Sequence, residues 1–179
     1  MLRILVLYST VDGQTRRIAQ RLAERLEKQG NAVELAALET ISSLAGFDHV
    51  VIGASIRYGK YRPALFTFIE RHQAELAEKG AAFFSVNLVA RKPGKDSAEG
   101  NPYIRLFQSK SVWNPPLLGV FAGRLDYPSY GFWDRNIIRF IMWLTKGPTA
   151  PDSVQEFTRW DRVTEFADQI AAQLSEGAQ

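Results

Sequence analysis

A run of hydroxyl residues around one glycine follows the first apolar segment of the chain. Residues 4–7 are apolar, and a helical pattern begins near residue 13. Backbone N–H groups at the start of a helix point toward an anion, and the helix dipole places about half a positive charge there. The hydroxyls of three residues in the turn are further donors. We therefore predict a phosphate-binding turn made of Ser9, Thr10, Val11, Asp12, Gly13, Gln14 and Thr15.

The turn matches neither of two common nucleotide-binding patterns. It lacks Gly-x-x-x-x-Gly-Lys-Ser/Thr, the pattern of a P-loop, and it lacks Gly-x-Gly-x-x-Gly, the dinucleotide fingerprint. A turn rich in serine and threonine is also common as a plain helix cap. The turn alone indicates an anion, and it leaves both the ligand and this purely structural alternative open.

Two further loops carry side chains suited to a flat ligand. The first contains two aromatic residues and three cations around Gly59, where the backbone can approach a ligand closely while the rings stack on it. In the second, Asn87 offers both a donor and an acceptor. The structural alternatives are a solvated loop with aromatics folded onto the core and an ordinary turn asparagine. The two loops consist of Ser55, Ile56, Arg57, Tyr58, Gly59, Lys60, Tyr61, Arg62 and Pro63, and of Ser85, Val86, Asn87, Leu88, Val89, Ala90, Arg91 and Lys92.

Composition removes several kinds of chemistry. The chain has no cysteine, which excludes disulfides, thiolate catalysis and cysteine-bound metal. Its two histidines, His49 and His72, show no metal-ligand spacing, so we expect no metal site and a structural role for both, with His72 on the polar side of a helix. The net charge of +3 suits an anionic partner or a membrane surface. No apolar run is long enough for a transmembrane helix, and the start of the chain does not resemble a signal peptide.

Strand and helix patterns alternate along the 179 residues, as in a single α/β domain over residues 1–179. Apolar runs predict strands at 3–8, 32–38, 48–55, 81–86 and 117–122. Periodic segments predict helices at 13–28, from Pro63 onward, at 103–110 and at 160–174. This alternation implies a parallel sheet between two helical layers, which binds ligands at the carboxyl ends of its strands. The three loops described above all follow such ends.

An aromatic, amphipathic segment at residues 127–147 does not fit this alternation. On a helical wheel its apolar residues span roughly 200°, and Arg135, Asn136 and Arg139 lie opposite. The sheet core is complete without it, so we expect a surface for a membrane, a substrate or a partner. The alternative is a helix packed against its own domain. The apolar arc is formed by Ile137, Ile138, Phe140, Ile141, Met142 and Leu144.

Taken together, the three loops resemble those of flavodoxin-like FMN proteins. The turn at 8–15 is similar to the phosphate loop of that family, and the other two loops are similar to its isoalloxazine-binding loops. The resemblance implies a three-layer sandwich with a five-stranded parallel sheet of order 2-1-3-4-5 and a long insert after or within the fifth strand. The three motifs, and the long insert, resemble still more closely the bacterial, quinone-dependent protoporphyrinogen IX dehydrogenases of the HemG type.

This closer resemblance implies FMN as cofactor, protoporphyrinogen IX as substrate and a respiratory quinone, menaquinone or ubiquinone, as acceptor. The chemistry is then carried by the flavin, and we expect no catalytic protein residue. Peripheral binding at the cytoplasmic face of the bacterial inner membrane follows, and a homo-oligomer stays open. The expected cofactor contacts are residues 9–15, together with Ser55, Ile56, Arg57, Tyr58, Gly59, Lys60, Ser85, Val86, Asn87, Leu88, Ala122 and Gly123. The expected substrate or membrane contacts are Arg57, Lys60, Arg62, Arg91, Lys92, Tyr130, Trp133, Phe140 and Trp143.

Other functions on the same fold predict different features. A flavodoxin that only carries electrons is usually acidic, whereas this chain is basic. An NAD(P)H:quinone reductase would be reduced rapidly by NADPH. A signalling receiver domain needs acidic residues after the first strand and an aspartate after the third, where Ser9, Thr10, Ala54 and Ser55 stand instead. We expect no nucleic-acid partner, because the basic residues flank the predicted pocket and form no stripe.

Overall fold

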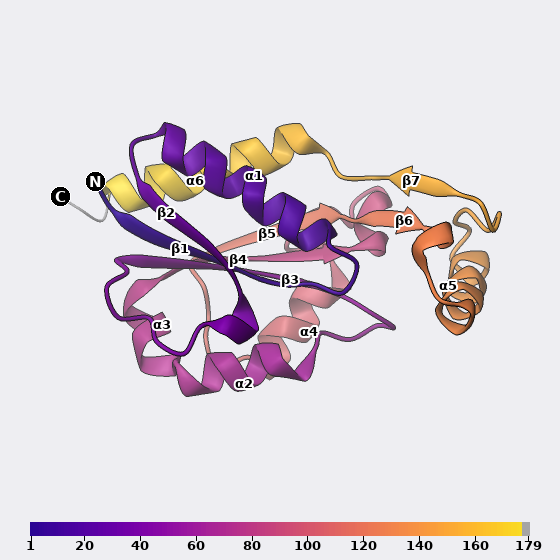
Figure 1. Ribbon diagram of the computed structural model, residues 1–179, viewed down its shortest axis with the longest axis horizontal. Coiled ribbons are helices and arrows are strands. Elements are labelled where there is room, and N and C mark those ends of the chain that lie inside the picture. The colour runs from indigo at the N-terminus through magenta and orange to yellow at the C-terminus, as the bar shows by residue number, and fades with distance from the viewer. Residues whose placement is uncertain (177–179) are drawn as a thin grey trace.

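A five-stranded parallel sheet forms the centre of the molecule. The structure, a computed structural model, describes residues 1–176. The strand order is β2-β1-β3-β4-β5, which confirms the predicted flavodoxin-like order, and Figure 1 shows the sheet between its two helical layers. The strands are β1 (Arg3–Ser9), β2 (Ala32–Ala37), β3 (His49–Ser55), β4 (Gly80–Asn87) and β5 (Leu117–Ala122).

Helices cover both faces of this sheet. On one face lie α1 (Gln14–Lys28) and α6 (Trp160–Glu176), and on the other lie α2 (Pro63–Arg71), α3 (Gln73–Lys79) and α4 (Pro102–Lys110). Three short 3₁₀ helices, η1 (Leu38–Thr40), η2 (Leu88–Arg91) and η3 (Tyr127–Ser129), follow strands. Because side chains alternate along a strand, every central strand supplies both cores.

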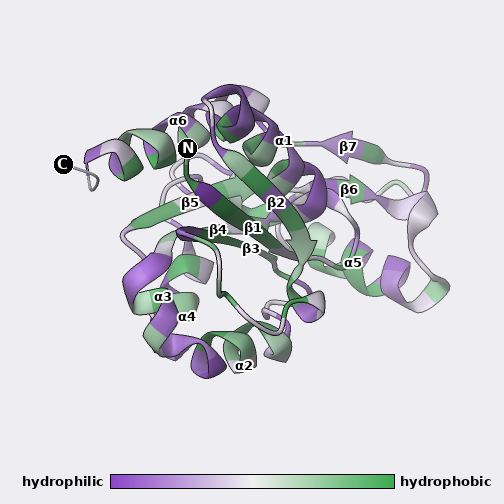
Figure 2. Cartoon of the chain, turned by 60° about the vertical axis from the view of Figure 1, so that its left-hand side comes forward, coloured by the Kyte–Doolittle hydropathy of each residue, from purple (hydrophilic) through white to green (hydrophobic). Residues whose placement is uncertain are grey.

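The aromatic residues of β4 show this alternation clearly. Phe83 and Phe84 are both fully buried, yet they lie in different cores. Phe83 stacks on Phe107 of α4 with 3.8 Å between ring centroids, whereas Phe84 contacts Phe121 edge to face. A continuous apolar run in the sequence is therefore what a strand covered on both sides requires, and Figure 2 shows the middle of the central strands as hydrophobic.

The helix that begins at Pro63 is interrupted. His72 separates α2 from α3 with φ −107° and ψ 22°, so the periodic pattern does not continue across it. The expectation that His72 lies on a polar helix face is wrong, because the break turns its ring inward. The side chain is 5% exposed, and its Nδ1 lies 3.0 Å from Glu75.

The insert leaves the sheet after β5 and returns before α6. β5 pairs with β4 along its whole length, so the insert follows the fifth strand and does not split it. Two short strands, β6 (Arg124–Asp126) and β7 (Val154–Glu156), pair antiparallel, and α5 (Phe132–Leu144) lies between them in sequence. This ribbon has three residues in each strand, too few for a clear alternating pattern, which is why the sequence did not predict it.

Candidate functional site

A cavity of about 180 Å³ opens at the carboxyl ends of β1, β3 and β4, beside the inner side of α5. This is the edge where an open parallel sheet binds ligands. All three predicted loops contribute to it, and so does the insert. Its lining comprises Thr10, Asp12, Gln14, Thr15, Ser55, Ile56, Arg57, Tyr58, Gly59, Val86, Asn87, Leu88, Val89, Arg91, Tyr103, Gly123, Arg124, Tyr130, Ile138, Ile141, Met142 and Thr145.

The turn after β1 has the geometry of an anion site. Gly13 precedes α1 with φ 88°, a conformation that glycine adopts without strain, and its N–H donates to Thr10 Oγ1 at 3.0 Å. The first turn of α1 carries no acidic residue. The Thr15 hydroxyl is buried and has no hydrogen-bond partner within residues 1–176. A buried hydroxyl without a partner is costly, so this group fits a phosphate oxygen that accepts a hydrogen bond from it.

Three other residues of this turn differ in their access to the cavity. Gln14 donates to Thr158 Oγ1 at 2.9 Å and to Glu156 Oε1 at 2.7 Å, so its amide links α1 to the end of the insert. Ser9 is 1% exposed and Val11 is 48% exposed, and neither lines the cavity. Gln14 lines the cavity despite these contacts, and the ligand contacts of Ser9 and Val11 stay predictions.

The loop after β3 forms a tight turn. Arg57 and Lys60 exchange two backbone hydrogen bonds, of 2.9 and 3.1 Å, around Tyr58 and Gly59. Both central residues have positive φ, 50° at Tyr58 and 74° at Gly59, as in a type I′ turn. Gly59 suits this conformation, whereas Tyr58 adopts it at a steric cost. The turn places Arg57 and Tyr58 on the cavity and leaves Lys60 exposed outside it.

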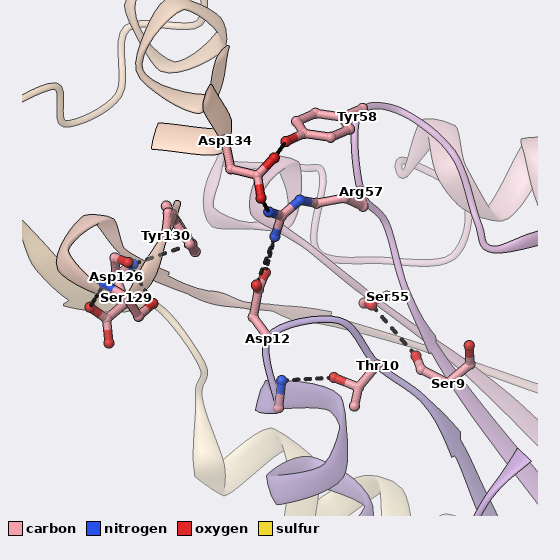
Figure 3. A network of polar contacts seen from close by, with 11 residues as sticks. Ser9, Thr10, Asp12, Ser55, Arg57, Tyr58, Asp126, Ser129, Tyr130 and Asp134 are labelled. Atoms are coloured by element: carbon pink, nitrogen blue, oxygen red, sulfur yellow. Dashed lines mark hydrogen bonds and ion pairs between the residues drawn. The ribbon is translucent and has the colours of Figure 1, made fainter. Parts of the chain in front are cut away.

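Arg57 is the centre of a polar network, which Figure 3 shows from close by. Its Nη1 lies 2.6 Å from Asp12 Oδ2, and its Nη2 lies 2.9 Å from Asp134 Oδ2 on α5. Tyr58 donates its hydroxyl to the same Asp134 carboxylate. The guanidinium also lies over the rings of Tyr58 and Tyr130, 5.1 and 5.3 Å from their centroids. Two carboxylates and two rings therefore fix this arginine.

These contacts explain the charge states in the network. Burial disfavours the charged form of Arg57, but the hydrogen bond and charge of Asp12, with Tyr58, raise its pKa above the usual value. The hydrogen bond from Tyr58, together with the charge of Arg57, holds the pKa of Asp134 below its usual value. Arg57 and Asp134 are therefore charged at neutral pH.

The end of β4 is fixed by buried amides. Asn87 accepts from the Ala90 N–H at 3.0 Å and exchanges side-chain hydrogen bonds with Asn101, of 3.2 and 3.4 Å. Ser85 is fully buried and accepts from Tyr61 at 2.8 Å, so its hydroxyl does not reach the cavity, whereas Asn87 lines it. Burial, the main cause, raises the pKa of Tyr61 well above its ordinary value. Asn101 was not predicted, because it follows a long polar loop with no strand pattern.

The end of β5 contributes one of its two predicted residues. Gly123 lines the cavity, but Ala122 does not. The Ala122 carbonyl instead accepts a hydrogen bond of 2.6 Å from Thr158, next to α6.

The predicted substrate cations do not form one free cluster. Arg57 pairs with two carboxylates, and Arg62 pairs with Glu39. Arg91 donates to the carbonyls of Leu88 and Thr145, at 2.7 and 3.3 Å, and burial lowers its pKa. Lys60 and Lys92 form no ion pair within the described part of the chain. Of the five cations, only Arg57 and Arg91 line the cavity.

The insert helix is oriented differently from the helical-wheel expectation. Only Ile138 and Met142 of α5 are buried, and Arg135 and Arg139 are half-buried on the same side. Their guanidinium groups donate to the carbonyls of Tyr130 and Thr149, at 3.2 and 2.8 Å, so arginine lies on the inner side of the helix. Seven large apolar residues stay exposed on α5: Phe132, Trp133, Ile137, Phe140, Ile141, Trp143 and Leu144.

This orientation places the four aromatic residues predicted to contact a substrate or a membrane in two different environments. Trp133, Phe140 and Trp143 are exposed, but Tyr130 is 6% exposed and belongs to a small core of the insert. Tyr130 therefore cannot contact a membrane surface, and it lines the cavity instead. Ile138, Ile141 and Met142 line the cavity as well. The sequence did not predict this, because their spacing is equally that of an outward-facing stripe.

Neither a metal cluster nor a spanning helix is found in the part of the chain that the structure describes. No group of three or more histidine, aspartate or glutamate residues within residues 1–176 could hold a metal ion. No helix in the same range has the length and hydrophobicity needed to cross a membrane.

Comparison with known proteins identifies the class. The family model "Flavodoxin domain" matches residues 5–152, so the chain belongs to the flavodoxin domain family. Flavodoxin 1 of Bacillus cereus has a TM-score of 0.53 at 15% identity and covers 95% of this chain and 97% of its own. An archaeal flavodoxin has a TM-score of 0.55 at 12% identity, covering 97% and 99% of the two chains. These structures show the fold.

Sequence relatives place the chain more narrowly. A protein of Escherichia coli strain K12 called protoporphyrinogen IX dehydrogenase [quinone] is 42% identical over 172 residues, which is 95% of each chain. A protein of the same name from Leishmania major is 43% identical over 176 residues, 95% of this chain and 75% of its own. The chain therefore belongs to the protoporphyrinogen IX dehydrogenase [quinone] family.

Proposed function

We propose that this protein binds FMN and oxidises protoporphyrinogen IX to protoporphyrin IX, with a respiratory quinone as electron acceptor. The observation that carries the proposal is the 42% identity to relatives of that activity across 95% of both chains. The cavity supports it independently, because an anion site and an aromatic rim meet there.

The residues of the cavity fit FMN. The partnerless hydroxyl of Thr15, the Thr10 hydroxyl and the first N–H groups of α1 would hold the phosphate. Asn87, at the end of β4, and Tyr58, at the end of β3, would lie beside the ring. The apolar side chains of α5 exclude water from the same space. No acidic or nucleophilic residue of the cavity needs to react.

The overall reaction balances with three molecules of quinone. Bound FMN supplies transfer of two electrons at a time from the porphyrinogen to the quinone. Three rounds remove six electrons and six protons and yield protoporphyrin IX and three quinols. The protein orients the two substrates in turn at one cavity, and it needs neither a metal nor a cysteine.

Cations outside the Arg57 network would receive the two propionates of the porphyrinogen. Lys60 and Lys92 form no ion pair within residues 1–176, and the partners of Arg91 in that range are uncharged oxygens, the carbonyls of Leu88 and Thr145 and the Thr145 hydroxyl. A carboxylate that binds these groups displaces no acidic side chain. Arg57 and Arg62 are already neutralised by aspartate and glutamate, so they are poorer candidates than the sequence indicated.

Visible spectroscopy tests this function directly. The purified protein, loaded with FMN, should bleach on anaerobic addition of protoporphyrinogen IX, and its flavin bands should return on addition of menaquinone or ubiquinone. Rapid bleaching by NADPH instead would favour a reductase. Failure to take up FMN would contradict the proposal as a whole.

We also propose that the outer side of α5 binds a membrane peripherally, at the cytoplasmic face of a bacterial inner membrane. Phe132, Trp133, Phe140 and Trp143 are between 59% and 77% exposed, and the exposed Lys146 follows the helix. Aromatic side chains beside cations suit the boundary between lipid headgroups and acyl chains. Quinones dissolve in that layer, so this site would meet its acceptor there.

A vesicle-binding assay tests whether the outer side of α5, and no other surface, binds the membrane. The triple variant Trp133→Ser, Phe140→Ser, Trp143→Ser should lose at least about tenfold in affinity for vesicles with anionic lipid. A control, Val112→Ser with Val154→Ser, removes two apolar side chains outside α5 that are each 49% exposed, and this variant should bind normally. Unchanged vesicle binding by the triple variant, or dimerisation of the unmodified chain through α5 in solution, would contradict membrane binding.

A further inference from the structure

Arg57 joins two segments that are far apart in the sequence. Asp12 belongs to the turn after β1, and Asp134 belongs to the first turn of α5, 122 residues further along the chain. The Arg57 side chain is only 16% exposed, although each carboxylate is at least 40% exposed. Figure 3 shows the guanidinium lying between the two acids.

The insert helix is also held at its other end by an arginine. Arg91, from the loop after β4, donates to the carbonyl and the hydroxyl of Thr145, both at 3.3 Å, at the carboxyl end of α5. Between the two ends, Ile138, Ile141 and Met142 line the cavity. The position of α5 beside the cavity therefore depends on two contacts made by the loops that form the site.

We propose that Asp134 is a positioning residue that holds α5 closed over the cavity through its contact with Arg57. This contact fixes the insert whichever substrate the cavity takes. Asp134 itself does not line the cavity, so its effect passes through Arg57 and Tyr58.

Closure of α5 also changes the charge at the edge of the cavity. Arg57 and Asp12 are neutral as a pair, and Asp134 adds one negative charge when α5 is docked. A negative charge near an electron acceptor makes its reduction less favourable. Opening of the insert would therefore raise the reduction potential of a flavin held in the cavity, and docking would lower it.

Hydrogen–deuterium exchange on the full chain, with and without FMN, tests the positioning role. Asp134→Asn keeps the shape of the side chain but removes its charge. Exchange across residues 132–138 should rise about fivefold, the effect of losing one ion pair of this exposure. Asp134→Glu should restore protection. Asp161→Asn breaks a more exposed pair, between Asp161 in the first turn of α6 and Arg159, and it should leave residues 132–138 unchanged.

Repeating the substitution in a second variant chain distinguishes the contact of Asp134 with its partners from a direct effect of its charge on the stability of α5. An aspartate in the first turn also stabilises a helix through the dipole, without any partner. In a chain with both Arg57→Gln and Tyr58→Phe, Asp134→Asn should add nothing to the exchange if Asp134 acts through these two residues. An additive increase, or no increase in the original background, would overturn the proposal.

The flavin potential provides the second readout. In the FMN-loaded protein, Asp134→Asn should shift the midpoint potential in the positive direction, while Asp134→Glu should leave it unchanged. An unchanged potential in Asp134→Asn would remove the electrostatic part of the inference. Failure to bind FMN would contradict the proposed function instead, and the exchange experiment without FMN would still decide the role of Asp134.

Discussion

The sheet and the insert treat aromatic residues in opposite ways. Phe83, Phe84 and Phe107 are completely buried in the two cores beside the sheet. On α5, Trp133 and Trp143 are 77% and 67% exposed. The difference arises because the central strands have helices on both faces, whereas α5 has the domain on one side only (Figures 1 and 2).

This contrast indicates that the two regions have different roles. Burial of a large apolar side chain is the main source of folding stability, and the sheet uses it fully. The insert buries a small core of its own, formed by Leu125, Tyr127, Tyr130, Ile138 and Met142, and leaves its largest side chains outside. The exposed side chains of α5 therefore contribute little to folding, and a binding role accounts for them better.

The largest expected effect tests the stability half of this comparison. Phe83→Ala should lower the free energy of unfolding by about 3–5 kcal/mol, because it removes a fully buried ring stacked on Phe107. Phe140→Ala, the matched change on α5, should alter it by less than about 0.5 kcal/mol. Urea denaturation monitored by circular dichroism measures both. Equal losses in the two variants would show that α5 supports the fold as strongly as the sheet does.

A smaller effect is expected at the anion site, where a buried polar group serves binding. Thr15→Val keeps the shape of the side chain and removes the hydroxyl that has no partner within residues 1–176. FMN affinity should fall about tenfold, the value of one hydrogen bond to a charged group, without loss of stability. Quenching of FMN fluorescence measures the affinity. Thr164→Val on α6 is the control, and a similar loss of affinity there would contradict a specific role for Thr15.

The smallest effect concerns the pH dependence of the Asp134 contact. The folded-state pKa of Asp134 is below its ordinary value, because Tyr58 donates to it and Arg57 lies beside it. Protonation therefore favours the unfolded state, so the contact stabilises the fold fully above about pH 4 and is lost as the pH falls through the lower, folded-state pKa. The difference in urea midpoint between the unmodified chain and Asp134→Asn should be constant near neutral pH and vanish in acid. A difference that persists at low pH would show that the charge is not its source.

Local pattern predicted most of the fold. Continuous apolar runs such as residues 4–7 indicate strands buried on both faces, and the alternation with helices then requires a parallel sheet. The exceptions have physical causes. His72 interrupts a helix whose apolar spacing looks unbroken, and the ribbon of β6 and β7 is held by backbone pairing with little help from side-chain pattern.

The sequence predicted which loops form the site better than it predicted which side chains of those loops face the cavity. The three loops do meet at one cavity, because the carboxyl ends of neighbouring parallel strands share an edge. Which side chains face the cavity depends on contacts between distant segments, and a single sequence does not show these. Ser85 is turned toward Tyr61, and the arginines of α5 face inward because the carbonyls of Tyr130 and Thr149 accept from them.

The position of the insert in the chain has a consequence for biosynthesis. α6 packs against α1 and, with it, covers one face of the sheet, yet it follows the whole insert in sequence. A ribosome therefore releases the insert, with its exposed tryptophans, before the core can be completed. Arg124 of β6 lies opposite Glu156 of β7 in the antiparallel ribbon, so the two ends of the insert meet once β7 has emerged. α6 then starts beside β5, the strand that it must cover. Nascent chains halted between residues 145 and 155 would expose the most hydrophobic surface to chaperones.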